Sequence, residues 1–429
     1  MTSELRVMSI YEGFFSGGAR ALHSAVVAGL HTGGSHRHSV LSIYGAMHRE
    51  TILQRMEDDA SYRALTAAGV TVTSLRRRVG GTSVGGTGAG GTRAGGTRAG
   101  GTRAGGGIGG TGGGGARRTF SAAEVATAAV HAERADIVLT LKEQPLRLVN
   151  RPEFPHRPVI VCLHRSDPEH QDGALADLRA AVAGGRIAAA ICCAESARTA
   201  YEAAGIPSGL LRVIPNGVDL SRFRPVPVGR RAAVRRAVGV PVKATVVTLA
   251  ARYDPMKDVP LFLRAARAFL RRAPSGHVLL CGAGMSTANA ELCGRLTDVF
   301  AEEPRLLSRV HLLGIRRDME AVYAASDVVA LTSVRGEAAP LCLIEGAMCG
   351  AVPVTTDVGD SADLVAGHGL VTSRDPDAIG AAWAEAARRR EELGPALLRS
   401  RGRFSQTRMI ASYAALIEHV HRDAGVRAR

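Results

Sequence analysis

Two glutamates in the second half of the chain have the side chains and spacing needed to bind hydroxyl groups. Glu337 and Glu345 stand eight positions apart in S-V-R-G-E-A-A-P-L-C-L-I-E-G-A-M-C-G, residues 333–350. A carboxylate only accepts hydrogen bonds and can accept them from both hydroxyls of a vicinal diol. We expect Glu337 at the carboxyl end of a strand and Glu345 in the next helix, with Pro340 at its first helical position. A helix-capping acid beside a solvated helix acid fits this stretch equally well.

Arg252 and Lys257 form a second candidate site, one for a diphosphate. They lie five positions apart in A-R-Y-D-P-M-K-D, residues 251–258, directly after an apolar run. A guanidinium can form two parallel hydrogen bonds with a phosphate, and an ammonium attracts it as a point charge. The only other lysines are Lys142 and Lys243, so a lysine in this turn favours a function. A solvated basic turn is the alternative.

Gly17, Gly18 and His164 are expected at the carboxyl ends of strands in the first half. The glycines separate the strand-like run 5–10 from a helix pattern. The free N–H groups and the dipole of a helix N-terminus favour a phosphate there, although a tight turn without a ligand has the same sequence pattern. His164 follows the apolar run 159–163. It is placed either to hydrogen-bond a ligand hydroxyl or to serve as a structural histidine.

Strands and helices alternate around these candidates through both halves. The predicted strands are 5–10, 38–44, 70–75, 137–141, 159–163, 187–193, 211–214, 244–249, 277–281, 310–313, 327–332 and 352–355. The predicted helices are 20–30, 50–68, 121–134, 174–183, 196–204, 259–272, 289–301, 318–325 and 409–420. Strict alternation predicts an α/β fold with two doubly wound, Rossmann-like sheets. Open sheets of this kind bind ligands at the carboxyl ends of their strands, which places the candidates in one cleft.

Turn and linker composition divides the chain of 429 residues into two domains and a final helix. P-N-G-V-D at 215–219 reads as a turn, and R-P-V-P-V-G at 224–229 reads as a linker. We therefore expect a first domain over residues 1–222, a second over 223–404, and a helix within 405–429 that packs back on the first domain.

A glycine- and arginine-rich insertion at 80–116 interrupts the first domain, with G-G-T-R-A repeated three times. Such a segment cannot bury apolar surface and is expected to be disordered. Its arginines are suited to phosphates of lipid head groups or nucleic acid, and a neutral insertion grown by repeat expansion is the alternative. Eight arginines and no acid lie between 76 and 118, so the formal charge of +15 falls to +7 for the rest.

Cysteine spacing and hydropathy indicate a cytoplasmic chain without disulfides or a metal site. The seven cysteines are odd in number, include no CxxC pair, and read as buried thiols. D-P-D at 375–377 has the letters of a metal-binding D-x-D, but a turn and helix cap explains it better. No run is long enough to span a membrane, and the start lacks a secretory pattern. The remaining basic charge is compatible with contact at the inner membrane surface.

Taken together, these motifs resemble those of the glycosyltransferase family 4 enzymes, which have the GT-B architecture. The resemblance covers nearly the whole chain and is strongest from 213 to 359. The matched motifs are the I-P-N-G-V-D signature at 214–219, the R-x4-K pair at Arg252 and Lys257, the E-x7-E motif at Glu337 and Glu345, the first glycine loop at Gly17 and Gly18, and T-D-V-G-D at 356–360, which resembles O-antigen and capsule transferases.

The resemblance implies retaining transfer of a hexosyl group from a nucleotide diphosphate sugar, most commonly one of uridine, to an acceptor hydroxyl without a metal or cofactor. The process would be synthesis of a cell-surface polysaccharide or glycoconjugate, and a lipid-linked acceptor is compatible with it. The implied catalytic residues are Arg252, Lys257, His164 and Glu337. The implied donor-binding residues are Gly17, Gly18, Arg252, Lys257, Ala338, Ala339, Leu341 and Glu345.

Two departures leave the donor sugar open. The family commonly has Gly-Phe-Pro after the first glutamate, where this chain has Ala338 and Ala339 before the proline, and Glu345-Gly346 replaces the usual Glu-Ala. A nucleotide-sugar epimerase of the same architecture is one alternative function. A nucleic-acid-binding protein acting through the glycine- and arginine-rich segment is another, but that segment has no interleaved aromatic residues for base stacking. We therefore expect no nucleic acid partner.

Overall fold

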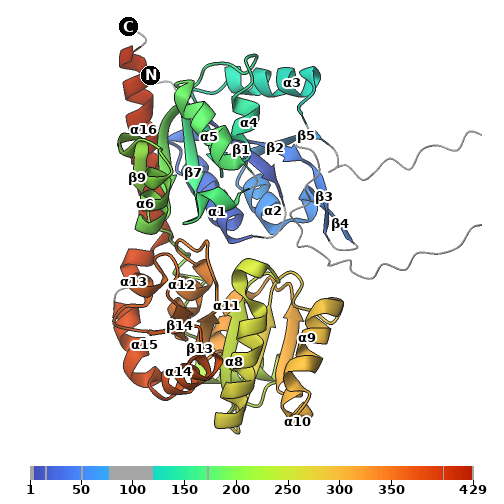
Figure 1. Cartoon of the computed structure of the whole chain (residues 1–429). Helices are drawn as coiled ribbons and strands as arrows, with labels where there is room; N and C mark the ends of the chain where they lie inside the picture. The colour runs from blue at the N-terminus through green and yellow to red at the C-terminus, as the bar shows by residue number, and fades with distance from the viewer. Residues whose placement is uncertain are drawn as a thin grey trace, which may run out of the picture.

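The protein consists of two α/β domains, one above the other in Figure 1. The structure is a computed structural model that describes residues 4–14, 17–49, 52–76, 119–171, 173–399 and 401–427. The insertion at 80–116 lies outside the described residues. Each domain is built on one parallel sheet, of seven strands in the first domain and six in the second. The predicted fold class, two doubly wound Rossmann-like domains, is confirmed.

The first sheet has the strand order β5-β2-β1-β6-β7-β8-β9. Its strands are β1 (Leu5–Gly13), β2 (His36–Tyr44), β5 (Thr71–Arg76), β6 (Ile137–Leu141), β7 (Val159–Leu163), β8 (Ile187–Cys192) and β9 (Leu211–Val213). Its helices are α1 (Gly18–Thr32), α2 (Ala60–Ala67), α3 (Ala122–Glu133), α4 (Leu146–Val149), α5 (Ala174–Ala183) and α6 (Glu195–Ala203). Central strands such as β7, V-I-V-C-L, are apolar throughout because both faces of the sheet are covered.

The predicted helix over 50–68 was wrong in its first part. An antiparallel hairpin of β3 (Ala46–Arg49) and β4 (Ile52–Arg55) occupies this region. Helix α2 begins only after Asp59, whose carboxylate accepts the N–H of Ser61 at 2.8 Å. The pairing between the two strands decides this structure, and local periodicity does not report it.

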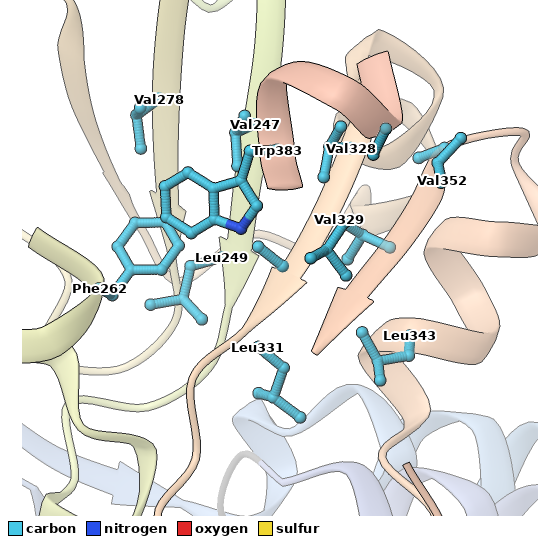
Figure 2. Close-up of a cluster of buried hydrophobic side chains, with 14 of the residues drawn as sticks. Val247, Leu249, Phe262, Val278, Val328, Val329, Leu331, Leu343, Val352 and Trp383 are labelled. Carbon is cyan, nitrogen blue, oxygen red and sulfur yellow. The ribbon is translucent and has the colours of Figure 1, made fainter. Parts of the chain in front are cut away.

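The second sheet has the order β12-β11-β10-β13-β14-β15. Its strands are β10 (Thr245–Ala250), β11 (Gly276–Cys281), β12 (Val310–Gly314), β13 (Val328–Leu331), β14 (Val352–Thr356) and β15 (Leu370–Thr372). Its helices are α7 (Val228–Ala237), α8 (Val259–Arg272), α9 (Ala290–Phe300), α10 (Pro304–Leu307), α11 (Met319–Ala325), α12 (Leu341–Met348), α13 (Ser361–Val365), α14 (Pro376–Arg388) and α15 (Arg390–Arg399). Figure 2 shows the core of this domain, where Trp383 packs on Phe262 with ring centroids 4.9 Å apart.

The chain crosses between the domains twice, in two segments that lie side by side. The N–H of Val218 donates to the carbonyl of Phe404, and the N–H of Gln406 donates to the carbonyl of Val218, at 2.8 and 3.0 Å. A Cβ on Gly217 would lie 2.5 Å from the carbonyl oxygen of Ser405, so only glycine fits here. The P-N-G-V-D turn is therefore part of the connection between the domains.

The last helix, α16 (Gln406–Arg427), lies along the first domain (Figure 1). It buries Met409, Tyr413, Ile417 and Val420 in a cluster with side chains of β1 and α1. Each buried side chain of this size contributes about 1.5–3 kcal/mol, so the helix is a fixed part of that domain. Among the described residues, no helix combines the length and apolar character needed to cross a lipid bilayer.

Candidate active site

Glu337 and Lys257 form a joint unit at the carboxyl ends of β13 and β10. Glu337 is 6% exposed. Its Oε1 contacts the ammonium of Lys257 and accepts the hydroxyl of Ser333 at 2.6 Å. No described residue donates to Oε2 of Glu337, so this oxygen is free to accept hydroxyls of a ligand.

The loops that carry these two residues are fastened to each other. The hydroxyl of Thr332 donates to the carbonyl of Lys257 at 3.1 Å, and the N–H of Val334 donates to the carbonyl of Met256 at 2.9 Å. Arg374 adds a hydrogen bond to the carbonyl of Ser333 at 3.1 Å. The contact between lysine and glutamate is therefore held by the backbone on both sides and does not depend on two flexible side chains alone.

Glu345 lies further along α12 and shares a neighbourhood with this unit. Its carboxylate accepts a hydrogen bond from the buried hydroxyl of Tyr323. Burial raises the pKa of Glu345 to about 7, against the opposing effects of Tyr323 and Arg222. The thiol of Cys342 lies one turn earlier in α12, close enough that the charges of Lys257, Glu337 and Glu345 all affect its pKa, although burial has the largest effect and raises it.

Arg252 does not contact Glu337. Its side chain is 47% exposed and pairs with Asp254 at 3.1 Å. It is near enough to Lys142 of the first domain that its charge helps to lower the pKa of that lysine. The predicted pair is thus divided: Lys257 is bound to Glu337, and Arg252 lies toward the first domain.

His164 and Lys142 lie at the carboxyl ends of neighbouring strands β7 and β6. The Nε2 of His164 is buried and has no hydrogen-bond partner among the described residues. Burial, assisted by the charge of Lys142, lowers the pKa of His164 to about 3, so the ring is neutral. Lys142 adopts a left-handed backbone conformation with φ of 67°, and burial lowers its pKa.

Sequence reasoning did not select Lys142. No hydrogen bond or ion pair of its ammonium occurs within the described part of the chain. The signal that could have found it is its place directly after a predicted strand, in a chain with only three lysines.

The glycine loop of the first domain meets α12 of the second. Gly17 is the N-cap residue of α1, and as a glycine it has no side chain to cap that helix. A Cβ on Gly18 would lie 3.0 Å from Cδ1 of Leu341, the first residue of α12. The structure therefore brings the predicted residues Gly17, Gly18 and Leu341 together at the N-terminus of a helix, the end that favours an anion.

The first domain contacts the loop around Glu337 at alternate residues. The hydroxyl of Ser166 donates to the backbone carbonyl of Glu337. Arg335 pairs with Asp167 at 3.1 Å. A Cβ on the intervening Gly336, where φ is 73°, would lie 2.7 Å from a guanidinium nitrogen of Arg165. Glycine at this position permits the close approach of the two domains.

Ala338 and Ala339 face the first domain. Ala338 is 2% exposed and belongs to the apolar core cluster of that domain. The carbonyl of Ala339 accepts the side-chain amide of Asn216 at 2.9 Å. Because the side chain of Ala338 is enclosed by protein, the predicted donor contact of this residue could be made only through its backbone.

Asp360, in the T-D-V-G-D segment, caps a helix of the other domain. Its carboxylate accepts the N–H groups of Glu195 and Ser196, the first residues of α6, at 2.9 and 2.8 Å. The residue at the N-cap of α6, Ala194, has no side chain that could do this. Gly359, with φ of 62°, is needed because a Cβ there would lie 2.0 Å from the carbonyl oxygen of Glu337.

The structure also accounts for the late D-x-D sequence. Asp375 accepts the N–H of Ala378 at 2.8 Å and so caps α14, as expected. The described residues contain no group of three or more His, Cys, Asp or Glu side chains placed to hold a metal ion.

In this structure two Rossmann-like domains meet at the carboxyl ends of their strands. A helix N-terminus lies on one side of the junction, and a lysine–glutamate pair lies on the other. This arrangement defines the GT-B class. A profile described as Glycosyltransferase Family 4 matches residues 61–222, and one described as Glycosyl transferases group 1 matches residues 244–389. The two matches fall on the two domains and together cover most of the chain. The chain belongs to glycosyltransferase family 4.

Individual relatives agree with this assignment. A D-inositol 3-phosphate glycosyltransferase of Saccharomonospora viridis is 38% identical over 154 residues, covering 35% of each chain. One of Geodermatophilus obscurus is 31% identical over 243 residues, covering 53% of this chain and 52% of the relative. These matches span about a third to a half of the length of the curated relatives.

Solved structures extend the similarity to the whole fold. The Anabaena protein Alr3699/HepE, crystallised in complex with UDP-glucose, superposes with a TM-score of 0.73 at 19% identity. The match covers 97% of this chain and 100% of that one. At this identity the likeness concerns the fold, and it places the chain in the GT-B architecture.

Proposed function

We propose that the protein transfers a hexosyl group from a UDP-sugar to an acceptor hydroxyl with retention of the anomeric configuration. The observation that carries this proposal is the state of Glu337: Oε1 is held by Lys257 and Ser333, and Oε2 has no donor among the described residues. A fixed carboxylate with one free oxygen suits recognition of sugar hydroxyls. The similarity in fold to a protein crystallised with UDP-glucose supports the donor class.

In this proposal the charges that develop during transfer are met by groups already in place. The sugar ring becomes positive as its bond to the diphosphate breaks, and the carboxylate of Glu337 stabilises that charge. The leaving diphosphate becomes more negative, and Lys257, Arg252 and the N–H groups at the start of α1 stabilise it. Lys257 has three N–H donors, so it can keep its contact with Glu337 while it binds a phosphate. Glu345 holds the ribose.

For the acceptor we propose a molecule that carries a phosphate group. Lys142 supports this because its ammonium has no ion pair among the described residues, and the buried Nε2 of the neighbouring His164 has no hydrogen-bond partner there either. The relatives are named for D-inositol 3-phosphate. A lipid-linked phosphate sugar offers the same chemistry and fits the resemblance of T-D-V-G-D to capsule transferases. The product would enter a cell-surface polysaccharide or glycoconjugate.

Thermal unfolding with UDP, GDP, ADP and dTDP sugars tests the donor, because a ligand that binds only the native state stabilises it. We expect the uridine sugar to raise the unfolding temperature most; no stabilisation by any of the four would contradict the proposal. Incubation of that donor with inositol 3-phosphate, with free inositol and with a lipid-linked acceptor then identifies the acceptor. An epimer formed from donor alone would instead establish the epimerase.

A further inference from the structure

A strongly basic cavity lies in the second domain at the amino ends of the strands, at the opposite end of the sheet from Glu337. Its volume is about 580 Å³. It lies beside the residues that lead into β10, helix α7, and the carboxyl ends of α8 and α14. The basic side chains that line it are Arg231, Arg235, Lys243, Arg272, Arg388 and Arg390.

Among the described residues lining this basic cavity, Asp327 carries the single carboxylate, and its oxygens are already used. It accepts Nη2 of Arg231 at 2.6 Å, Nη2 of Arg235 at 2.8 Å and the N–H of Val246 at 2.8 Å. Six basic side chains against one carboxylate leave an excess of five positive charges. Burial lowers the pKa of Arg231 to about 10, and the nearby charges of Arg390 and Arg235 add to this effect against that of Asp327.

The remaining basic groups have N–H donors to spare. Lys243 and Arg388 are exposed, and neither forms an ion pair or side-chain hydrogen bond within the described part of the chain. Within the described residues, Arg272 forms one ion pair, with Asp377, which is 72% exposed and therefore readily exchanged for another anion. Its Nη1 also donates to the carbonyl of Ala268 at 3.1 Å. Arg390 donates Nε to the carbonyl of Gly350 at 3.0 Å, and the same nitrogen lies 3.9 Å from Oδ1 of Asp327.

Helix dipoles explain part of this arrangement but not all of it. Arg272 and Arg388 are the last residues of α8 and α14, where a cation is favoured by the carboxyl end of a helix. Lys243 has no such role, because it lies in the turn before a strand. Lys243 therefore adds positive charge to the basic cavity without stabilising a helix. The cavity is large enough for a small-molecule ligand, since such sites start at about 300 Å³.

We propose that this basic cavity is a second binding site, for a small polyanion with two or more phosphate groups. Arginine and lysine form short, charge-assisted hydrogen bonds with phosphate, and more than one phosphate is needed to neutralise the excess positive charge of this cavity. This site is separate from the candidate active site: β13 starts at the basic cavity beside Asp327 and ends at the loop that carries Glu337. The proposal therefore does not depend on the proposed transferase activity.

Isothermal titration calorimetry of the full chain with inorganic tripolyphosphate tests this proposal. The titration is made in about 0.1 M salt. UDP is present in excess so that the diphosphate site at the domain junction is occupied. We compare the parent with Lys243→Ala/Arg388→Ala. The control, Arg264→Ala/Arg305→Ala, removes the same charge from exposed arginines that do not line the basic cavity. Equal unfolding temperatures of both variants establish that they fold.

We expect saturable binding at one site in the parent, weakened about tenfold or more in the first variant and by less than about twofold in the control. Absence of saturable binding in the parent would overturn the proposal. An equal loss in both variants would overturn it too, since it would show an adventitious ion attracted by net charge. The comparison of two surface variants holds whether or not UDP binds at the junction.

Discussion

The two sides of the domain junction differ in how their charged groups are satisfied. On the second domain, Lys257 and Glu337 are paired and Glu345 is bonded to Tyr323. On the first, the Nε2 of His164 has no partner among the described residues, and neither has the ammonium of Lys142. Buried polar groups in native proteins are nearly always hydrogen-bonded. We therefore expect a bound ligand to provide the missing partners on the first-domain side of the junction. The second domain is preorganised, whereas the first depends on its ligand.

Substitution of the preorganised side should have the largest effect. We expect Lys257→Ala to lower kcat/KM by a factor that corresponds to about 2–4 kcal/mol, because it removes both the support of Glu337 and a stabiliser of the leaving diphosphate. Steady-state kinetics with the identified donor measure this. Arg305→Ala, an exposed charge away from the junction, is the control. A Lys257→Ala enzyme within twofold of the parent would remove the role of the pair.

Substitution of Lys142, on the first-domain side of the junction, should not reduce the stability of the protein. Lys142→Met keeps the apolar stem but removes an ammonium whose charged form is disfavoured by burial, against the smaller opposing effects of Glu12 and Glu143. The unfolding temperature should therefore rise or stay unchanged. The KM for a phosphate-bearing acceptor should rise by a factor equivalent to about 1.5–3 kcal/mol. Lys257→Met, which breaks an existing pair, should instead lower the unfolding temperature. Loss of stability in both variants would show that the two walls do not differ.

The cap between the domains offers a smaller but selective test. Asp360→Ala should lower the free energy of unfolding by about 0.5–2 kcal/mol, as the loss of other helix caps does. It should also raise the KM for the donor, because the segment beside Glu337 loses its hydrogen bonds to the start of α6. Asp375→Ala removes a cap inside the second domain and is the matched control. We expect similar losses of stability but an unchanged KM for the control. Equal KM values in the two variants would reduce Asp360 to a purely structural residue.

The smallest effect should be the pH dependence of nucleotide binding. The pKa of Glu345 is raised to about 7 by burial, so at lower pH its carboxyl is protonated and accepts hydrogen bonds poorly. Affinity for UDP should therefore rise as pH increases through about 7, by less than tenfold per pH unit. Calorimetry at several pH values measures this, with Glu345→Gln as the variant that should lose the dependence. A parent with constant affinity between pH 6 and 8 would exclude a ribose contact by this residue.

Local pattern was sufficient for most of the fold. The strands at 137–141 and 159–163 match the observed β6 and β7 to the residue, because apolar runs bounded by turns report buried parallel strands directly. The hairpin of β3 and β4 was missed since strand pairing depends on a partner outside the local window. The helix after Glu337 begins one residue later than expected, with Pro340 at its N-cap.

The candidate site was predictable only as a set of residues. Spacing and type selected Lys257 and Glu337, but nothing in the sequence states that they touch or that Arg252 pairs elsewhere. Asp360 was noted as part of a motif, yet its partner is the start of α6, some 165 positions earlier in the chain. Contacts between domains depend on how two independent folds dock, which no local pattern encodes.

A crystal structure of the protein bound to a non-transferable UDP-hexose analogue, with a second one bound to UDP for comparison, tests the central claim most directly. The diphosphate should lie between the start of α1 and Lys257, and a sugar hydroxyl should lie about 2.5–3.2 Å from Oε2 of Glu337. A nucleotide bound elsewhere, or a sugar that does not reach Glu337, would contradict the account.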